Sequence, residues 1–339
     1  MREANFLKAL RGKACHPHPA WFMRQAGRYL PEYRAVREKA GSFLDLCFSS
    51  ELAAEVTLQP IRRYDLDAAI LFADILLMPM VLGQDLAFEK GEGPRLSPAL
   101  GDSTFDPAAA RNMDIVAPVY ETVKRVRSEL AEDKALIGFA GAPWTVATYM
   151  IAGRGVKDTA ALRRFAYEQP ERFAALIAAL EDVTIDYLCG QVEAGADALQ
   201  LFESWASGLP ADFVRQWCLA PAARIASAVK KRHPEVPVIA FPKGAGSLYL
   251  DFAKEPVFDG LSLGTEVDPH WAKENLSAKT LQGGLDPLLV AAGGEEMRSA
   301  ARRLKDTFAG TPYIFNLGHG FVPDTPPENV AELVSIIRE

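Results

Sequence analysis

The sequence predicts an α/β fold, a single (β/α)8 barrel of the TIM type, over residues 1–339. Three observations support it. Short apolar runs alternate with helical patterns, the alternation occurs eight times, and no repeat or low-complexity linker divides the chain. A doubly wound open sheet is the rival architecture. It is disfavoured by the count of eight and because the chain has no nucleotide-binding glycine fingerprint.

The eight expected strands are almost entirely apolar, as parallel strands are when both faces of their sheet are covered. In chain order they are 21–23, 68–72, 136–139, 198–202, 236–241, 260–263, 281–283 and 313–316. Enzymes with this fold take their catalytic groups from the carboxyl ends of the strands, so the active site is expected there.

Helical patterns fill the segments between these strands. The clearest are 51–64, 107–130, 171–193, 213–232 and 295–309. Asp106, followed by a proline, predicts the N-terminus of the second helix, and a capping box from Thr325 to Glu328 predicts the start of a last helix. Two connections are long: 84–98 is expected to be a surface excursion, and 142–160 a mobile lid over a site.

Composition narrows the class of protein. Hydrophobic residues make up 49% of the chain, enough for a large core, and the net charge of −7 argues against general nucleic-acid binding. The cysteines, Cys15, Cys47, Cys189 and Cys218, form no C-x-x-C pair or zinc-ribbon pattern and suit a reducing cytosol. No apolar segment fits a signal peptide or the ~20 residues of a membrane span, so we expect a cytoplasmic protein.

Basic groups lead the polar side chains at the expected strand ends, although the whole chain is acidic. These side chains include Arg24, Arg28, Asp74, Tyr149, Glu203, Ser204, Lys243 and His319. A cationic site that also contains aromatic groups predicts an anionic small-molecule substrate.

These assignments have structural alternatives. Arginines four residues apart, such as Arg24 and Arg28, bind carboxylates or phosphates in bidentate fashion, or they are surface residues on a helix. Asp74 lies in an apolar run, where a carboxylate is functional or bonds to backbone amides as a cap. His319, between two glycines, contacts a ligand or is a hydrogen-bonded structural histidine.

Five segments together resemble the uroporphyrinogen decarboxylase family across nearly the whole chain. They are PAWFMRQAGRYLPEYR at 19–34, LFADIL at 71–76, GFAGAPWTVATYM at 138–150, LQLFESWA at 199–206 and FNLGHG at 315–320. The first segment is highly specific to this family, and the others follow in the expected order.

The resemblance implies a homodimeric barrel enzyme of haem biosynthesis. It would remove carbon dioxide from the four acetate side chains of uroporphyrinogen III, giving coproporphyrinogen III, with no metal and no organic cofactor. By resemblance, Arg24, Arg28 and Arg37 meet substrate carboxylates or donate protons, and Asp74 faces the pyrrole N–H groups. Further polar contacts to the substrate side chains would come from Tyr149, Ser204 and His319.

Two other classes stay open. A zinc-dependent methyltransferase can share this barrel, but it needs a zinc-bound thiolate, and the only adjacent pair, Cys15 and His16, precedes the first strand. A non-catalytic tetrapyrrole carrier would need binding groups without an acid–base set. The residues also leave open which group donates each proton, because arginine, with a pKa above 12, is a poor acid in water.

Overall fold

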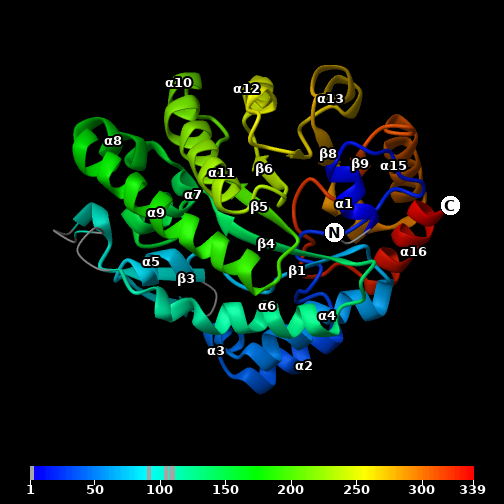
Figure 1. Cartoon of the computed structure of the whole chain (residues 1–339), viewed down its shortest axis with the longest axis horizontal. Coiled ribbons are helices and arrows are strands. Elements are labelled where there is room, and N and C mark those ends of the chain that lie inside the picture. Colours follow the sequence, from blue (N-terminus) through cyan, green and yellow to red (C-terminus); the bar gives the residue numbers. More distant parts are fainter. Residues whose placement is uncertain (1–3, 90–92, 103–105, 107–110) are drawn as a thin grey trace.

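The centre of the molecule is a curved sheet of parallel strands (Figure 1). The computed structural model describes residues 4–89, 93–102, 106 and 111–339. In spatial order the strands are β1 (Ala68–Ile70), β4 (Ala135–Gly141), β5 (Ala198–Glu203), β6 (Val238–Pro242), β7 (Gly260–Leu263), β8 (Thr280–Gly283) and β9 (Tyr313–Ile314). Every neighbouring pair is parallel. The predicted barrel fold is confirmed, with strand ends shifted by a few residues.

An extended segment, residues 19–23, fills the eighth position and closes the barrel. On one side, the Phe315 N–H donates to the Pro19 carbonyl over 2.8 Å, and on the other the Asp67 N–H donates to the Ala20 carbonyl over 2.9 Å. The segment therefore joins β9 to β1, the two edges of the sheet.

The predicted strand at 21–23 is wrong as a regular strand. Side chains accept several of the N–H groups that a ladder would use: Ala20 N–H donates to Asp67, Phe22 N–H to Gln25 and Met23 N–H to Asn316. Only an isolated bridge between Ala20 and Phe315 remains. The apolar pattern found the segment, but it could not show that side-chain acceptors replace the backbone partner.

Helices cover the outer face of the sheet (Figure 1). The longer ones are α2 (Pro31–Ala40), α4 (Ser50–Tyr64), α6 (Ala117–Glu129), α7 (Pro143–Ala152), α9 (Pro170–Ala194), α11 (Ala220–Arg232), α15 (Gly294–Thr307) and α16 (Pro327–Arg338). The shorter ones are α1 (Asn5–Leu10), α3 (Phe43–Phe48), α5 (Leu77–Val81), α8 (Ala160–Glu168), α10 (Ala211–Val214), α12 (Tyr249–Lys254), α13 (Pro269–Asn275) and α14 (Pro287–Ala292). Single turns lie at Leu100–Asp102, Met113–Val116 and Gly246–Leu248. Within the described ranges, no helix is both long and apolar enough to cross a membrane.

Two predicted helices differ from the structure near their starts. The helix expected over 107–130 is α-helical only from Ala117 within the described residues, after a short turn, and its predicted start at 107–110 lies outside them. The last helix has Pro326 as its N-cap, and no side chain caps it, so the predicted box from Thr325 to Glu328 does not form. The reason is that the chain is still extended at Pro326, which leaves Thr325 one residue too early.

Both long connections contain regular structure. Residues 84–98 include a hairpin of β2 (Asp85–Glu89) and β3 (Gly93–Ser97), although 90–92 lie outside the described residues. Most of 142–160 is α7, which is apolar and buried on nearly all sides. The predicted lid is therefore wrong for this helix, and the loop that follows is tied to β3 because the Leu96 N–H donates to the Gly153 carbonyl over 2.8 Å.

The barrel interior is apolar toward its amino end and polar at mid-height. Helix α1 packs there with Trp21, Ala68, Ile137 and other interior residues. Higher up, Trp21 Nε1 donates to Gln282 Oε1 over 3.1 Å, and Gln282 Nε2 donates to Gln200 Oε1 over 2.7 Å. These bonds join the closing segment to β8 and β5, so the interior is filled and functional space is left to the carboxyl ends.

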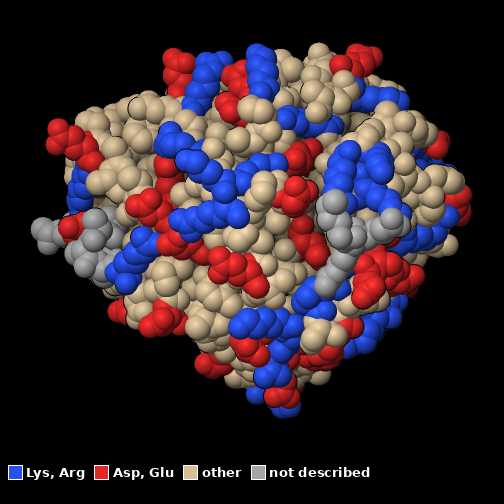
Figure 2. Space-filling view, in the orientation of Figure 1, with Lys and Arg blue, Asp and Glu red and all other residues tan. Residues whose placement is uncertain are grey.

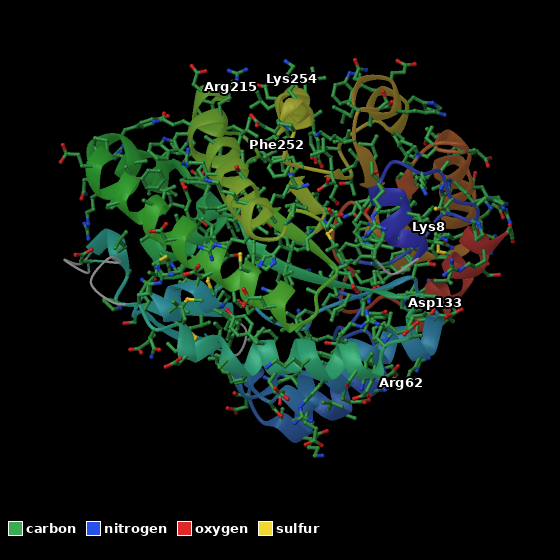
Figure 3. The ribbon with its side chains drawn as sticks, in the orientation of Figure 1. Lys8, Arg62, Asp133, Arg215, Phe252 and Lys254 are labelled. Carbon is green, nitrogen blue, oxygen red and sulfur yellow. The ribbon has the colours of Figure 1, made fainter. Side chains whose placement is uncertain are left out.

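A π-helical segment, η3 (Arg215–Leu219), links α10 and α11 into one continuous helix. Its Arg215 donates to Asp251 of α12 over 2.8 Å, and Lys254 lies 3.5 Å from the same carboxylate. Figure 3 shows Arg215 and Lys254 at the same edge of the molecule, with Phe252 further inside. The Arg215–Asp251 pair therefore joins η3 to α12, whereas the Lys254–Asp251 pair lies within α12. Single-turn π segments are frequent near functional sites.

The ion pair between Arg127 and Asp197 yields a stability prediction. Asp197 Oδ2 accepts from Arg127 Nη1 and from the Leu136 N–H, each over 2.8 Å, and both charged side chains are largely buried. Asp197→Ala should lower the free energy of unfolding by about 3–5 kcal/mol, because the guanidinium loses its anion. Glu121→Ala, which breaks an exposed pair with Arg125, is the control and should cost at most about 1 kcal/mol. Urea unfolding of both variants measures this, and equal losses would contradict it.

Candidate active site

The chain turns sharply where the closing segment ends, and this turn carries Arg24. Its backbone is left-handed, with φ of 61°, a conformation that costs a non-glycine residue roughly 1–3 kcal/mol. Its side chain lies against Gly320, where a Cβ would sit 2.4 Å from the Arg24 Cδ. The strained backbone of Arg24 and the absence of a side chain at Gly320 thus together hold the Arg24 guanidinium at the carboxyl end of the barrel.

Arg24 and Arg28 are two cations without an anion. Both side chains are exposed, and neither forms an ion pair with any carboxylate in the described part of the chain. The pKa of Arg24 is lowered, first by the protein around it and then by the nearby charge of Arg28. Two arginines that repel each other are stabilised by an anionic ligand between them.

Arg34 and Arg37 have structural partners. Arg34 Nη1 donates to the carbonyls of Arg28 and Tyr29 over 2.8 and 3.1 Å, so it shapes the turn below Arg28. Arg37 Nη1 donates to the Gly41 carbonyl at the end of its own helix over 2.9 Å. Cys47 lies within electrostatic reach of both Arg37 and Asp74.

Asp74 lies in the loop between β1 and α5 and is only partly exposed. Its Oδ1 accepts from the Leu76 N–H over 2.8 Å, as an aspartate in a turn does. Oδ2 accepts no hydrogen bond from the described residues. Burial raises the pKa of Asp74 to about 6, and the Leu76 bond opposes that rise. Near pH 7 the group is therefore mainly a carboxylate with one oxygen left for a donor.

Tyr149, on α7, connects these groups. It lies within electrostatic reach of both Asp74 and Arg24, and burial raises its pKa. Its ring is 6.4 Å from that of Trp205, which stands edge-on to it. Ser204, just past the end of β5, is half-buried, and its N–H donates to Thr145 of the same helix α7 over 2.8 Å.

His319 follows β9 and faces two cations. Its pKa is lowered to about 4, mainly by burial and then by the positive charges of Lys243 and Arg24. It is neutral at pH 7 and can donate through one ring nitrogen while accepting through the other. The glycine before it is required by space, because a Cβ at Gly318 would sit 2.4 Å from the Thr265 nitrogen.

The structure brings most of the predicted residues together. Electrostatic contacts connect Arg28 to Arg24, Arg24 to Tyr149 and His319, and Tyr149 to Asp74. Arg37 is connected less directly, through Cys47 to Asp74 and through Tyr33 to Arg28. Lys243, a strand-end residue for which no role was predicted, belongs with this group because its charge acts on His319. Its position directly after an apolar strand was the available signal.

The cysteine–histidine pair lies at the other end of the barrel. Cys15 and His16 line a cavity of about 250 Å³, together with His18, Lys305 and residues near them, next to the amino ends of the strands. Within the part of the chain that the structure describes, no three His, Cys, Asp or Glu side chains are grouped as a metal would need. Elsewhere, Figure 2 shows basic and acidic side chains interspersed over the visible face.

At the strand ends of this parallel barrel, two arginines have no carboxylate partner and one carboxylate oxygen has no donor within the described residues, an arrangement typical of an enzyme site for a small anionic molecule. The family model for uroporphyrinogen decarboxylase (URO-D) matches residues 1–339, and the chain belongs to that family. Proteins named uroporphyrinogen decarboxylase from Paracoccus denitrificans and Rhodospirillum rubrum are 52% and 50% identical to it. The alignments cover 100% of both chains in the first case, and 98% of this chain and 96% of the relative in the second.

Solved structures support the fold independently. A methyltransferase from Methanosarcina mazei superposes with a TM-score of 0.74 over 99% of this chain and 98% of its own, at 19% identity. A B12-independent methionine synthase from Shewanella sp. W3-18-1 gives a TM-score of 0.57 over 86% and 87%, at 11% identity. At such identities the likeness concerns the barrel alone.

The raised pKa of Asp74 predicts a pH effect on stability. A carboxyl whose pKa is higher in the folded state contributes stability that is present below its unfolded pKa and is lost as the pH rises through the folded value. Compared with Asp74→Asn, the wild-type protein should therefore lose stability between pH 3.8 and about 6, with no further change above. Urea unfolding at several pH values measures the difference. Parallel profiles would show that the pKa is not raised.

Proposed function

We propose that this chain is a uroporphyrinogen decarboxylase, which converts the four acetate side chains of uroporphyrinogen III to methyl groups and so forms coproporphyrinogen III. Membership in the family supports the activity. One observation carries the assignment to this site. Among the residues that the structure describes, Arg24 and Arg28 have no carboxylate partner, and Asp74 Oδ2 has no hydrogen-bond donor. A macrocycle with carboxylates at its rim and N–H groups at its centre supplies both.

The chemistry needs an electron sink for each acetate. When a proton adds to the ring carbon beside the acetate, the pyrrole becomes cationic and can accept the electron pair of the breaking C–C bond. Carbon dioxide leaves, and a second proton on the new CH2 group, with loss of the first, gives the methyl group. The net change per acetate is uptake of one proton and release of one carbon dioxide. The substrate is its own sink, so we propose that no metal or organic cofactor takes part.

The proposed role of each residue in the reaction follows from its charge. We assign Arg24, Arg28 and Arg37 to the rim carboxylates or to proton donation, and Tyr149, Ser204 and His319 to further polar contacts with the side chains. Asp74 is assigned to the pyrrole N–H groups, where a carboxylate stabilises the cationic ring in the transition state. Neutral His319 adds a donor without adding charge.

Anaerobic incubation with uroporphyrinogen III tests this function. We expect carbon dioxide and coproporphyrinogen in a ratio of four to one, and activity that survives prolonged treatment with a chelator. A carrier would bind the macrocycle without release of carbon dioxide. Turnover that a chelator abolishes and zinc restores would favour the methyltransferase class instead.

Asp74→Asn separates a catalytic role from a structural one. The variant keeps the shape and one acceptor oxygen but loses the charge, and its amide turns donors toward the N–H groups of the ring. Turnover should fall at least ~100-fold while the protein stays folded. The alternative, an aspartate that only shapes its turn, predicts a lower melting temperature with near-normal turnover per folded molecule. Both quantities are measured on the same sample.

We also propose that the protein acts as one barrel domain, forms a homodimer and works in the cytoplasm, as its family resemblance implies. Sedimentation velocity at micromolar concentration should give about twice the chain mass of 37.0 kDa. An active species that sediments as a monomer would contradict the dimer.

A further inference from the structure

Glu203 carries a buried carboxyl group on the outer, helix-covered side of the barrel. It is the last residue of β5 and only 2% exposed. Side chains alternate along a strand, so Glu203 points to the opposite face from Phe202. Phe202 packs with the interior residues, whereas Glu203 contacts Thr145 of α7 and lies within electrostatic reach of Cys218 in η3. It therefore lies on the helix side, away from the site.

Three hydrogen bonds connect this carboxyl and its neighbours to α7. The Thr145 hydroxyl donates to Glu203 Oε1 and accepts from the Ser204 N–H over 2.8 Å. Trp144 Nε1 donates to the Trp205 carbonyl over 3.0 Å. One threonine hydroxyl thus joins the end of β5 to the helix that also carries Tyr149.

We propose that Glu203 and Thr145 are positioning residues, which together hold Ser204 and Trp205 in place and, through the Trp205 ring, orient Tyr149 for the reaction. This inference rests on the proposed function, because that function is what places Ser204 and Tyr149 against the substrate. Neither Glu203 nor Thr145 is assigned a contact with substrate.

The surroundings of Glu203 suit a neutral carboxylic acid. Burial raises its pKa from 4.5 to about 8, against the opposing effect of hydrogen bonds from Thr145 and Trp205. The groups that face it are the Thr145 hydroxyl on α7, the Trp205 N–H, 3.4 Å from Oε1, and the Cys218 thiol on η3. No basic side chain pairs with it within the described residues, and Oε2 is buried without a partner there. An uncharged group costs far less to bury at such a place.

Thr145→Val tests the connection, since it keeps the shape and removes only the hydroxyl. Its matched control is Thr122→Val on α6, another fully buried threonine, whose hydroxyl donates to the Pro118 carbonyl of its own helix over 2.9 Å. We expect kcat/KM for uroporphyrinogen III to fall about tenfold or more in Thr145→Val, and by less than about twofold in Thr122→Val. Thr145→Ser, which restores the hydroxyl, should recover activity to within about threefold of wild type. Equal activity per folded molecule in the two valine variants would overturn the proposal.

Hydrogen exchange gives a readout that does not depend on turnover. The Ser204 amide loses its acceptor in Thr145→Val, so its exchange should accelerate, while Thr122→Val leaves it unchanged. Fast exchange with normal turnover would mean that the connection exists but does not serve the reaction, and the positioning role would be rejected. If the wild-type protein has no decarboxylase activity, the proposed function is rejected instead, even where the Ser204 amide exchanges faster in Thr145→Val.

Glu203→Gln keeps the shape in an always neutral form, so it should retain most of the activity. Because the pKa of Glu203 is raised in the folded state, wild-type stability should fall relative to this variant as the pH rises from 4.5 to about 8. Parallel profiles, or a Glu203→Gln variant as inactive as Thr145→Val, would show that the charged form is the one the protein uses.

Discussion

The hydrogen bonds that hold residues 19–23 between β9 and β1 are the constraint on which the rest of the structure depends. This segment makes too few backbone pairs to form a strand, so side chains complete it. Asp67 is the central acceptor: its Oδ2 binds the Ala20 N–H over 2.8 Å and also pairs with Arg338 of the last helix over 2.8 Å. One carboxylate therefore fixes both barrel closure and the docking of α16. The turn that presents Arg24 and Arg28 starts from this closed edge.

Much of the fold could be predicted because buried parallel strands are nearly uniform in their apolar character. The strand at 260–263 was predicted to the residue, and the other strands of the sheet differ only at their ends. The errors arose where side chains take over backbone roles or where the chain stays extended. Side-chain acceptors replace a ladder at 21–23, and the extended Pro326 displaces the expected cap at Thr325.

The candidate site was predictable for a different reason. The carboxyl ends of parallel strands meet at one edge, so residues that follow successive strands come together whatever their separation in sequence. Arg24, Asp74, Tyr149 and His319 were found in this way. The link from Glu203 to Ser204 could not be predicted, because it depends on a threonine of a helix reaching the end of a strand. Nothing in the spacing of Thr145 indicates that contact.

Charge is distributed unevenly around the strand ends. Toward the site, Arg24 and Arg28 pair with no carboxylate of the described residues, and Asp74 Oδ2 accepts no hydrogen bond from them. His319, near Arg24, and Glu203, on the helix side of β5, are held neutral by burial. A ligand that brings anions and N–H donors therefore relieves the repulsion between cations and satisfies the carboxylate, while the neutral groups need no counter-ion. Affinity for such a ligand comes from interactions that the empty protein leaves incomplete.

The contact between Arg24 and Gly320 joins segments that lie far apart in the sequence. During synthesis the arginine turn is therefore made long before the glycine against which it packs. Until β9 pairs with residues 19–23, the turn lacks the hydrogen bonds to Asn316 and Phe315, although those to Asp67 and Ala68 on the β1 side can form without them. The group of cations at the strand ends is therefore complete only once the segment that carries Gly320 has joined the barrel, long after the arginine turn itself has been made.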